Sequence, residues 1–376
     1  MKKEVSPIVG VLGILITLTA VMLGYWFGLV GGGKEDVQPK GSAKSAGKAE
    51  GAAAEASGPP VGTLAGGAQP GYLDGPAAES LFSGPSGVAV DRDGAVYIAD
   101  SRNHCLRKIA GDGVVTTIAG TTTEGFADGV GAAARFSGPA AVALAPDGSL
   151  FVSDTGNHRI RRIARDGAVS TFAGSDTPRD DIGRAGGGRK DGPATQAQFQ
   201  YPVGLAVDAA GTVYVADVGN HCVRRISPAG QVTTIAESGG RMDSPTELAL
   251  VADRLWVSDT GKGQLWTGPR EGPLQPWRPA GKEKGPKAPS GLAADGADLY
   301  VADSGGHCLF RLTGERFVFV AGKPGVSGFS DGQGGAARFS LPAGLAAGAG
   351  GRLYIADFGN NRIRELKPEA ESQEGR

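Results

Sequence analysis

VYIAD, at residues 96–100, is the first of six copies of one short phrase: an apolar strand that ends in Asp and precedes a tight turn. The other copies are LFVSD, VYVAD, LWVSD, LYVAD and LYIAD, and they end at Asp154, Asp217, Asp259, Asp303 and Asp357. Successive Asp residues, counted from Asp100, are 54, 63, 42, 44 and 54 residues apart. Periods of about 40–50 residues are typical of propeller arrays, and longer intervals indicate loop insertions.

The repeating unit can be derived from the first complete copy. Four short apolar segments follow one another at residues 84–91, 95–100, 104–109 and 114–120. The first two are joined by Asp93-Gly94, a hairpin turn signal. Four consecutive antiparallel strands with short turns make one propeller blade. The sequence therefore predicts an all-β protein, a six-bladed β-propeller with four-stranded blades.

The sixth copy is incomplete, because the chain has no fourth strand after residue 366. A matching segment, VGTLAG, stands at residues 61–66, ahead of the first complete blade. An unpaired sheet edge invites pairing with other chains, so closure of the ring is favoured. We therefore predict that this N-terminal strand completes the last blade.

Two of the turns carry a more specific signature. DTGNHRIRRI at residues 154–163 and DVGNHCVRRI at residues 217–226 resemble the NHL-repeat family, and the resemblance covers nearly the whole chain from residue 59 onward. It implies a six-bladed propeller of the NHL/YWTD-like type, in agreement with the count of copies. The fourth copy departs most, with Lys262-Gly263 in place of Asn-His, and the sixth has Asn361 in place of His.

The N-terminus has a different character. Residues 8–30 are 23 residues without a charge, preceded by Lys2 and Lys3, with Tyr-Trp-Phe at residues 25–27. A helix of this length spans the hydrocarbon core of roughly 30 Å, whereas a cleaved signal peptide has an apolar region of about 7–15 residues. We expect one transmembrane helix with a cytoplasmic N-terminus and an extracytoplasmic propeller.

Composition then divides the chain into four parts. These are a transmembrane anchor at 1–33, a low-complexity flexible linker at 34–58, the propeller at 59–368 and a disordered tail at 369–376. Gly24 and Gly28 form a small-xxx-small pair that suggests a weak anchor-mediated dimer. The expected localisation is the cell membrane, as a single-pass protein.

The loops between blades share an Asp-Gly pair followed by a Phe shortly before the next inner strand. The Phe residues are Phe82, Phe136, Phe199 and Phe339, and we expect each to pack between neighbouring blades. The third loop carries an insertion at residues 175–190. Binding function on rigid scaffolds usually resides on such loops.

Histidine and aspartate recur at fixed repeat positions. His104, His158, His221 and His307 lie on four different blades, whereas zinc ligands must converge within about 2.0–2.3 Å of one ion. We interpret them as structural. The six repeat Asp residues (Asp100, Asp154, Asp217, Asp259, Asp303 and Asp357) are predicted to accept N–H groups of the following turn. Cys105, Cys222 and Cys308 follow His and are predicted to be buried small hydrophobes.

Basic doublets recur on the third strand, at residues 107–108, 161–162 and 224–225, with Arg364 in the last copy. We interpret them as a solvated strand edge whose side chains cover apolar surface. The chain has 38 basic and 39 acidic residues, a net charge of -1, which disfavours nucleic acid as a partner. An RNA-binding propeller is a second alternative only if the domain is cytoplasmic.

Some look-alikes of this fold are amidating lyases or lactonase-like hydrolases, whose metal ligands converge on the axial channel. The corresponding positions here are mostly small or apolar: Ser86, Ala140, Val203, Ser290 and Ala343. Only Glu247 adds a carboxylate, and one carboxylate makes neither a metal site nor an acid–base pair. The sequence therefore predicts no catalytic residue, metal ligand or cofactor. A calcium ion held by backbone carbonyls of the channel leaves no side-chain signature and stays open.

The hypothesis is a membrane-anchored propeller that acts as a binding, scaffold or sensor module for a protein, peptide or glycan at the cell envelope. The alternative is a metal-dependent lyase or hydrolase that uses the axial channel. The candidate binding face carries the Asn-His turns and the interblade loops, with residues Arg102, Asn103, His104, Asn157, His158, Asn220, His221, His307, Asn360, Arg179, Arg184 and Arg189.

Overall fold

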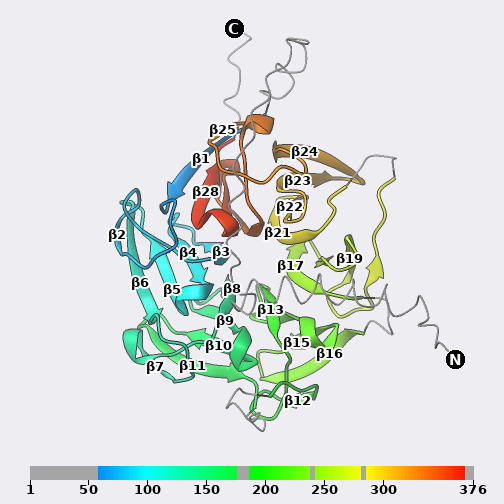
Figure 1. Cartoon of the computed structure of the whole chain (residues 1–376). Helices are drawn as coiled ribbons and strands as arrows, with labels where there is room; N and C mark the ends of the chain where they lie inside the picture. Colours follow the sequence, from blue (N-terminus) through cyan, green and yellow to red (C-terminus); the bar gives the residue numbers. More distant parts are fainter. Residues whose placement is uncertain (1–57, 176–185, 238–241, 281–284, 369–376) are drawn as a thin grey trace, which may run out of the picture.

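The computed structural model describes residues 58–175, 186–237, 242–280 and 285–368. These residues form six antiparallel sheets arranged around a central axis (Figure 1). The predicted anchor, the Gly24–Gly28 pair, nearly all of the linker, the C-terminal tail, Arg179 and Arg184 lie outside the described residues. In the part of the chain that is described, none of the helices has the length and apolar character needed to cross a membrane.

Each blade is a sheet that runs from an inner strand beside the axis to an outer strand. Blade one comprises β3 (Pro85–Val90), β4 (Val96–Asp100), β5 (Cys105–Ile109), β6 (Val114–Gly120) and a two-residue edge strand, β2 (Gly75–Pro76). Blade two comprises β8 (Pro139–Leu144), β9 (Leu150–Asp154), β10 (Arg159–Ile163), β11 (Ala168–Ala173) and β7 (Gly129–Val130). Blade three comprises β13 (Pro202–Val207), β14 (Val213–Asp217), β15 (Cys222–Ile226), β16 (Gln231–Glu237) and β12 (Gly192–Pro193).

Blades four and five have four strands each among the described residues. Blade four comprises β17 (Pro245–Val251), β18 (Arg254–Asp259), β19 (Gln264–Pro269) and β20 (Gln275–Pro276). Blade five comprises β21 (Pro289–Asp295), β22 (Asp298–Asp303), β23 (Cys308–Thr313) and β24 (Arg316–Gly322). Short 3-10 turns, such as η1 (Ser101–Asn103), follow the repeat Asp in blades one, two, three and six.

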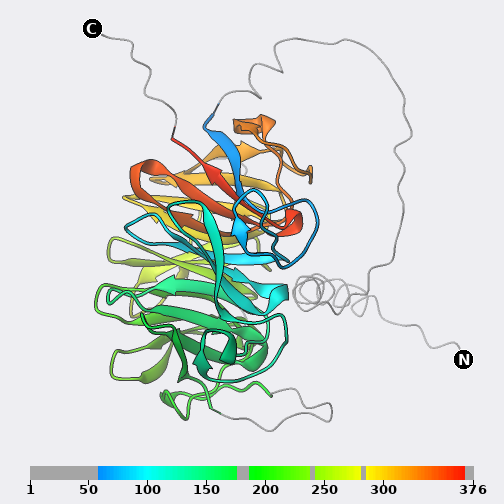
Figure 2. The same cartoon turned by 90° about the vertical axis from the view of Figure 1, so that its left-hand side faces the viewer.

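Blade six confirms the predicted closure of the ring. Its sheet contains β26 (Pro342–Ala347), β27 (Leu353–Asp357), β28 (Arg362–Leu366), the N-terminal β1 (Pro60–Ala65) and β25 (Gly332–Gln333). Val61 pairs with Leu366 and Thr63 pairs with Arg364, so both ends of the propeller lie in one sheet. Figure 2 shows the blue β1 beside the red strands of blade six.

The inner strands approach one another through a bulge in the segment after their first proline. In four blades the bulge residue is glycine, and a Cβ on Gly344 would lie 2.3 Å from the Ser86 carbonyl oxygen of the next inner strand. Blades two and four have Ala141 and Glu247 instead, and their N–H groups donate to the hydroxyls of Ser153 and Ser258. The glycine blades have alanine at that second-strand position. Glycine at the bulge therefore occurs with alanine on the second strand, and a residue with a side chain at the bulge occurs with serine there.

The core lies between the blades. Phe82, Phe136, Phe199 and Phe339 are each no more than 1% exposed. Phe82 packs in one cluster with Val88 of blade one and Tyr354 of blade six, which confirms its predicted place between blades. The three cysteines are free thiols and buried, also as predicted.

Candidate functional site

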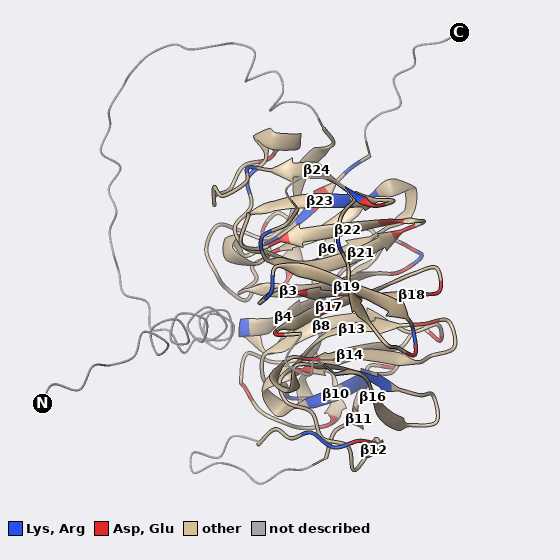
Figure 3. Ribbon diagram, turned by 90° about the vertical axis from the view of Figure 1, so that its right-hand side faces the viewer, with Lys and Arg blue, Asp and Glu red and all other residues tan. Residues whose placement is uncertain are grey.

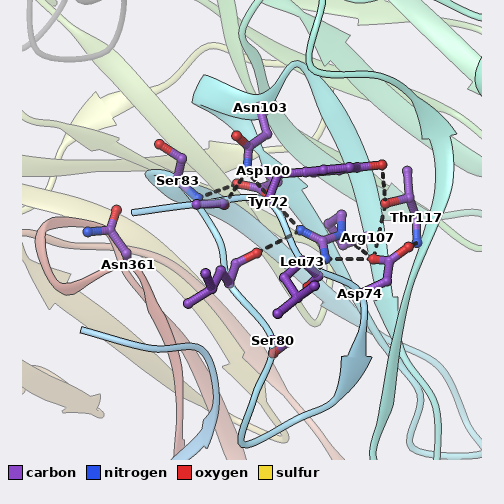
Figure 4. Close-up of polar contacts among 12 residues, drawn as sticks. Tyr72, Leu73, Asp74, Ser80, Ser83, Asp100, Asn103, Arg107, Thr117 and Asn361 are labelled. Carbon is purple, nitrogen blue, oxygen red and sulfur yellow. Dashed lines mark hydrogen bonds and ion pairs between the residues drawn. The ribbon is translucent and has the colours of Figure 1, made fainter. Parts of the chain in front are cut away.

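A buried arginine organises the face on which the Asn-His turns lie. Arg107, on β5, is 0% exposed. Its Nη1 donates to Asp100 Oδ2 at 2.8 Å, and its Nη2 donates to Asp74 Oδ1 at 2.6 Å (Figure 4). The guanidinium also lies over the ring of Phe82, 4.9 Å from its centroid. We name this set of one arginine and two aspartates the arginine cluster.

The arginine cluster is repeated in four of the six blades. Arg161 joins Asp154 to Asp128, Arg224 joins Asp217 to Asp191, and Arg364 joins Asp357 to Asp331. All four guanidiniums are fully buried, so the interpretation of the doublets as a solvated strand edge is wrong for their first residue. The second residues, Lys108, Arg162 and Arg225, are half-buried. Alternation along a strand explains this, because adjacent side chains point to opposite faces.

The repeat Asp of these blades binds a different backbone group from the one predicted. Asp100 Oδ1 accepts the N–H of Ser83, in the loop before the inner strand. The equivalent donors in blades two, three and six are Ser137, Gln200 and Ser340. Burial raises the pKa of Asp100 to about 6, although Asn103, the Ser83 N–H and Arg107 each lower it. The following turn contributes a side chain rather than an N–H group.

That side chain is the asparagine of each Asn-His turn. Asn103 Nδ2 donates to Asp100 Oδ2 and to the Gly71 carbonyl oxygen, both at 2.8 Å. Asn157, Asn220 and Asn360 repeat this pair of bonds with their own Asp and interblade loop. The turns and the interblade loops therefore lie on the same side of the disc, as expected. The asparagine amides are committed to internal hydrogen bonds.

Blades four and five lack the arginine cluster. Trp266 stands in the arginine position of blade four, and its Nε1 donates to Asp259 at 3.1 Å. Phe310 stands there in blade five. In these blades the Asp accepts two consecutive loop N–H groups, from Asp243 and Ser244 in blade four and from Lys287 and Ala288 in blade five. Turn N–H groups of Lys262 and Gly306 are added, as predicted for the following turn.

The histidines lie at blade boundaries. Each has a positive φ of 51° to 56° at the end of its turn. The N–H groups of Gly138, Tyr201 and Leu341, in the next blade, donate to Nδ1 of His104, His158 and His307 at 3.0, 2.9 and 3.1 Å. Asn361 does the same for Gly84, through its side-chain oxygen, at 3.0 Å. These bonds join each blade to the following one.

At the boundary between blades three and four, the hydrogen bond of the histidine runs in the opposite direction. His221 Nδ1 contacts the Asp243 carbonyl oxygen. A carbonyl oxygen only accepts, so Nδ1 of His221 carries the proton and donates. At the boundary between blades four and five the position is Gly263, which has no side chain to offer.

Exposed side chains of the same face form its outward surface. Arg102 is exposed and lies over the Phe358 ring, 4.9 Å from the centroid, and Arg189 is also exposed. Tyr72, Phe126 and Phe329 stand at one repeat position beside the asparagine-bonded glycines, and they are 43%, 37% and 45% exposed. They cover the guanidiniums of Arg107, Arg161 and Arg364. The sequence analysis did not identify these aromatic residues as part of the face, although each stands two residues before an Asp-Gly pair.

A hollow of ≈ 220 Å³ lies between blades two and three. It is lined by Phe126, Arg159, Phe172 and Thr195, among others. Arg159 is only 5% exposed, and its guanidinium lies 4.3 Å from the centroid of the Phe126 ring. This places an apolar ring and a buried cation beside the interblade loop that carries the insertion.

The side chains at the axial positions make hydrogen bonds to neighbouring strands and turns. Ser86 Oγ bonds Ser101 and the Ala140 carbonyl oxygen, and Ser290 Oγ donates to the Pro342 carbonyl oxygen at 3.0 Å. Glu247 Oε1 accepts the N–H groups of Leu205 and Leu248. Burial raises the pKa of Glu247 to about 8, against the lowering by these two bonds. Within the described ranges, no group of three or more His, Cys, Asp or Glu residues is placed to hold a metal ion.

The predicted four-stranded blade is found in blades four and five, and the other four blades carry a two-residue edge strand in addition. The closed ring of six blades defines the class of protein, a six-bladed β-propeller. Residues 82–109, 136–163, 199–226 and 339–366 match the NHL repeat. These repeat matches and the closed ring support the resemblance to the NHL-repeat six-bladed β-propellers. The matched segments are the four blades that contain an arginine cluster.

Relatives share 24–30% identity with this chain over long segments. Protein SUPPRESSOR OF QUENCHING 1, chloroplastic, of Arabidopsis thaliana is 28% identical over 79% of this chain and 26% of its own length. Human NHL repeat-containing protein 2 is 28% identical over 80% of this chain and 41% of its own length. Virginiamycin B lyase of Nocardia farcinica is 30% identical over 50% of this chain and 67% of its own. The chain thus spans less than half of the first two relatives.

Among solved structures, an auxiliary nutrient binding protein from Bacteroides thetaiotaomicron superposes with a TM-score of 0.61. The superposition covers 81% of this chain and 75% of that chain, at 17% identity. At this identity the likeness shows the fold alone.

Proposed function

We propose that this protein is a binding or scaffold module that recognises a protein, peptide or glycan through the face carrying the Asn-His turns. The observation that carries the proposal is the set of exposed aromatic side chains, Tyr72, Phe126 and Phe329, beside those turns on blades one, two and six. Exposed aromatic residues on a rigid scaffold are typical of recognition surfaces. A relative of this fold is named as a nutrient binding protein, which supports a binding role.

The apolar segment at residues 8–30 supports the second part of the proposal, a single membrane anchor that displays the propeller outside the cytoplasm. The Gly24–Gly28 pair supports a weak dimer of anchors. Charge argues against RNA as the partner, because the chain has 38 basic and 39 acidic residues. Figure 3 shows positions of both signs on the strands and loops of the side that it draws. The orientation is tested by protease protection of the propeller in sealed cells.

Binding is tested with arrays of glycans and of peptides as probes. The full chain is compared with a variant that carries Tyr72→Ser and Phe329→Ser. The control variant, Arg92→Ser with Asp93→Ser, changes the exposed β3–β4 hairpin turn at the opposite end of the strands. The proposal expects the first variant to lose the bound probe and the control to keep it. Equal binding of the probe by all three proteins would show that the binding site lies elsewhere on the molecule.

A second candidate is a metal-dependent lyase or hydrolase that works in the axial channel. It is favoured by the likeness to Virginiamycin B lyase and by Glu247 at the inner strands. Within the described residues, no group of three or more His, Cys, Asp or Glu side chains is placed to hold a metal ion, so Glu247 does not belong to a side-chain metal centre of that size. Elemental analysis of the dialysed protein decides between the candidates: a stoichiometric metal, including carbonyl-bound calcium, would favour the channel over the face.

A further inference from the structure

Two kinds of side-chain acceptor, a histidine nitrogen and an asparagine oxygen, bind the residue before an inner strand to the preceding blade. At the boundary between blades one and two, the Gly138 N–H donates to His104 Nδ1 at 3.0 Å. At the boundary between blades five and six, the Leu341 N–H donates to His307 Nδ1 at 3.1 Å. At the boundary between blades six and one, the Gly84 N–H donates to the Asn361 oxygen at 3.0 Å. The third bond uses an acceptor that does not titrate.

An imidazole nitrogen accepts a hydrogen bond only while it is unprotonated. A protonated His104 or His307 would turn an N–H toward the N–H of the next blade, and the two donors would repel. The His221 bond reverses this logic, because its Nδ1 donates to the Asp243 carbonyl oxygen and still donates when the ring is protonated. The propeller therefore has some blade boundaries that protonation should weaken and others that it should leave intact, although their construction is similar.

We propose that acidification opens this propeller at two boundaries, between blades one and two and between blades five and six, by protonating His104 and His307. The boundary between blades six and one, where Asn361 is the acceptor, stays closed in the same pH range. His158 accepts the equivalent bond from the Tyr201 N–H, at the boundary between blades two and three.

The surroundings of the two histidines favour the neutral ring. Burial lowers the pKa of His104, and Glu124 opposes this shift from the loop before β7. That carboxylate is itself engaged, since it accepts the Ser137 hydroxyl. Burial also lowers the pKa of His307, where Lys287, before β21, adds to the lowering and Asp303, at the end of β22, opposes it.

The sign of the effect follows from linkage. Each folded-state pKa lies below the ordinary value of 6.5, so the open state binds more protons than the closed state as the pH falls. The two bonds contribute fully above pH 6.5. Their contribution decreases below that value until the folded-state pKa is reached.

The test is residue-resolved hydrogen exchange of the full chain at about pH 7.5 and about pH 5, corrected for the intrinsic exchange rates. Protection of the Gly138 and Leu341 amides should fall as the pH drops below 6.5, by at most about tenfold per pH unit. Protection of the Gly84 amide, which Asn361 binds, should stay within about twofold. The Ser83 amide reports separately on Asp100, whose pKa burial raises to about 6.

The chain supplies its own control substitutions. His104→Asn and His307→Asn copy the acceptor found at Asn361, and they should remove the acid-dependent loss at Gly138 and Leu341. Asn361→His should transfer that loss to Gly84, which keeps the test decisive if the first variants fold poorly. His221→Asn should leave the acid response of Gly138 and Leu341 unchanged. The proposal is overturned if Gly138 and Leu341 lose no more protection than Gly84, or if the asparagine variants respond like the parent.

Discussion

Blades one, two, three and six bury a guanidinium against the repeat Asp, whereas blades four and five neutralise the same Asp with backbone N–H groups. In blade two, Asp154 takes Arg161 and one loop N–H, that of Ser137. In blade five, Asp303 takes two loop N–H groups, those of Lys287 and Ala288, and the Gly306 N–H. The carboxylate is satisfied in both ways, so a propeller does not need an arginine in every blade.

The difference reaches across the blade boundary. In the arginine blades, the second loop residue has a positive φ, as at Tyr201 (50°) and Leu341 (51°), and its N–H turns to the preceding blade. In blades four and five, the corresponding Ser244 and Ala288 give that N–H to their own Asp. The Ser244 N–H is therefore not available to His221, which contacts the Asp243 carbonyl oxygen instead. At the next boundary, Gly263 has no side chain that could accept a bond. The presence of an arginine in one blade thus coincides with the way in which the previous blade is attached.

The largest expected effect comes from breaking an arginine cluster. Arg161→Met leaves Asp154 buried without its cation, and we expect a loss of about 3–5 kcal/mol in the free energy of unfolding. Arg162→Met, one residue along, changes an exposed ion pair with Asp147 and should cost less than about 1 kcal/mol. Urea unfolding followed by circular dichroism measures both. Similar losses for the two variants would mean that the buried pair carries no special weight.

Blade four offers the matching test of a neutral donor. Trp266→Phe removes the N–H that donates to the Asp259 carboxylate, and we expect a loss of about 1.5–3 kcal/mol. Trp277→Phe is the control, because it keeps the ring contacts with Trp256 and Phe317. The comparison between blades would fail if Trp266→Phe were as costly as Arg161→Met in the same unfolding experiment.

Glu247 gives a pH-dependent effect. Its folded pKa of about 8 lies above the ordinary value of 4.5, so the folded state binds more protons between these values. Stability therefore falls as the pH rises through that window. Glu247→Gln should remove the fall and raise stability at about pH 8 by roughly 1–3 kcal/mol, with a smaller gain at about pH 5. Thermal unfolding at both pH values tests this, with Glu79→Gln on an exposed loop as the control; a gain that is independent of pH would contradict it.

The smallest expected effect concerns the loop residue before the inner strand, which has a left-handed backbone at Leu341 but not at Ala288. Leu341→Gly relieves a left-handed backbone, which costs roughly 1–2 kcal/mol for a residue with a side chain, and this offsets the lost contacts of Leu341. Ala288→Gly has no such strain to relieve and should cost about 0.5–1 kcal/mol. Chemical unfolding of the pair should show that Leu341→Gly is the milder change; the reverse order would argue against the switch in N–H direction.

Much of this architecture could be predicted from the repeat. Six strand phrases at regular spacing fix the number of blades, and the stray VGTLAG segment fixes the closure, because an unpaired strand must find an edge. The arginine clusters were readable too, since Arg107, Arg161, Arg224 and Arg364 each stand 33 residues after an Asp-Gly aspartate. Spacing alone did not reveal burial, because Arg-Lys and Arg-Arg doublets also occur on exposed strands.

The sequence by itself determined the repeat, the closed ring and the place of each turn, because strand periodicity and turn chemistry are local properties. The tertiary structure decided which member of each basic doublet is buried, which N–H group each Asp accepts and whether a histidine donates or accepts. These depend on how one blade lies against the next. Most of these contacts join residues 15 to 277 positions apart, and local sequence carries no direct record of such contacts.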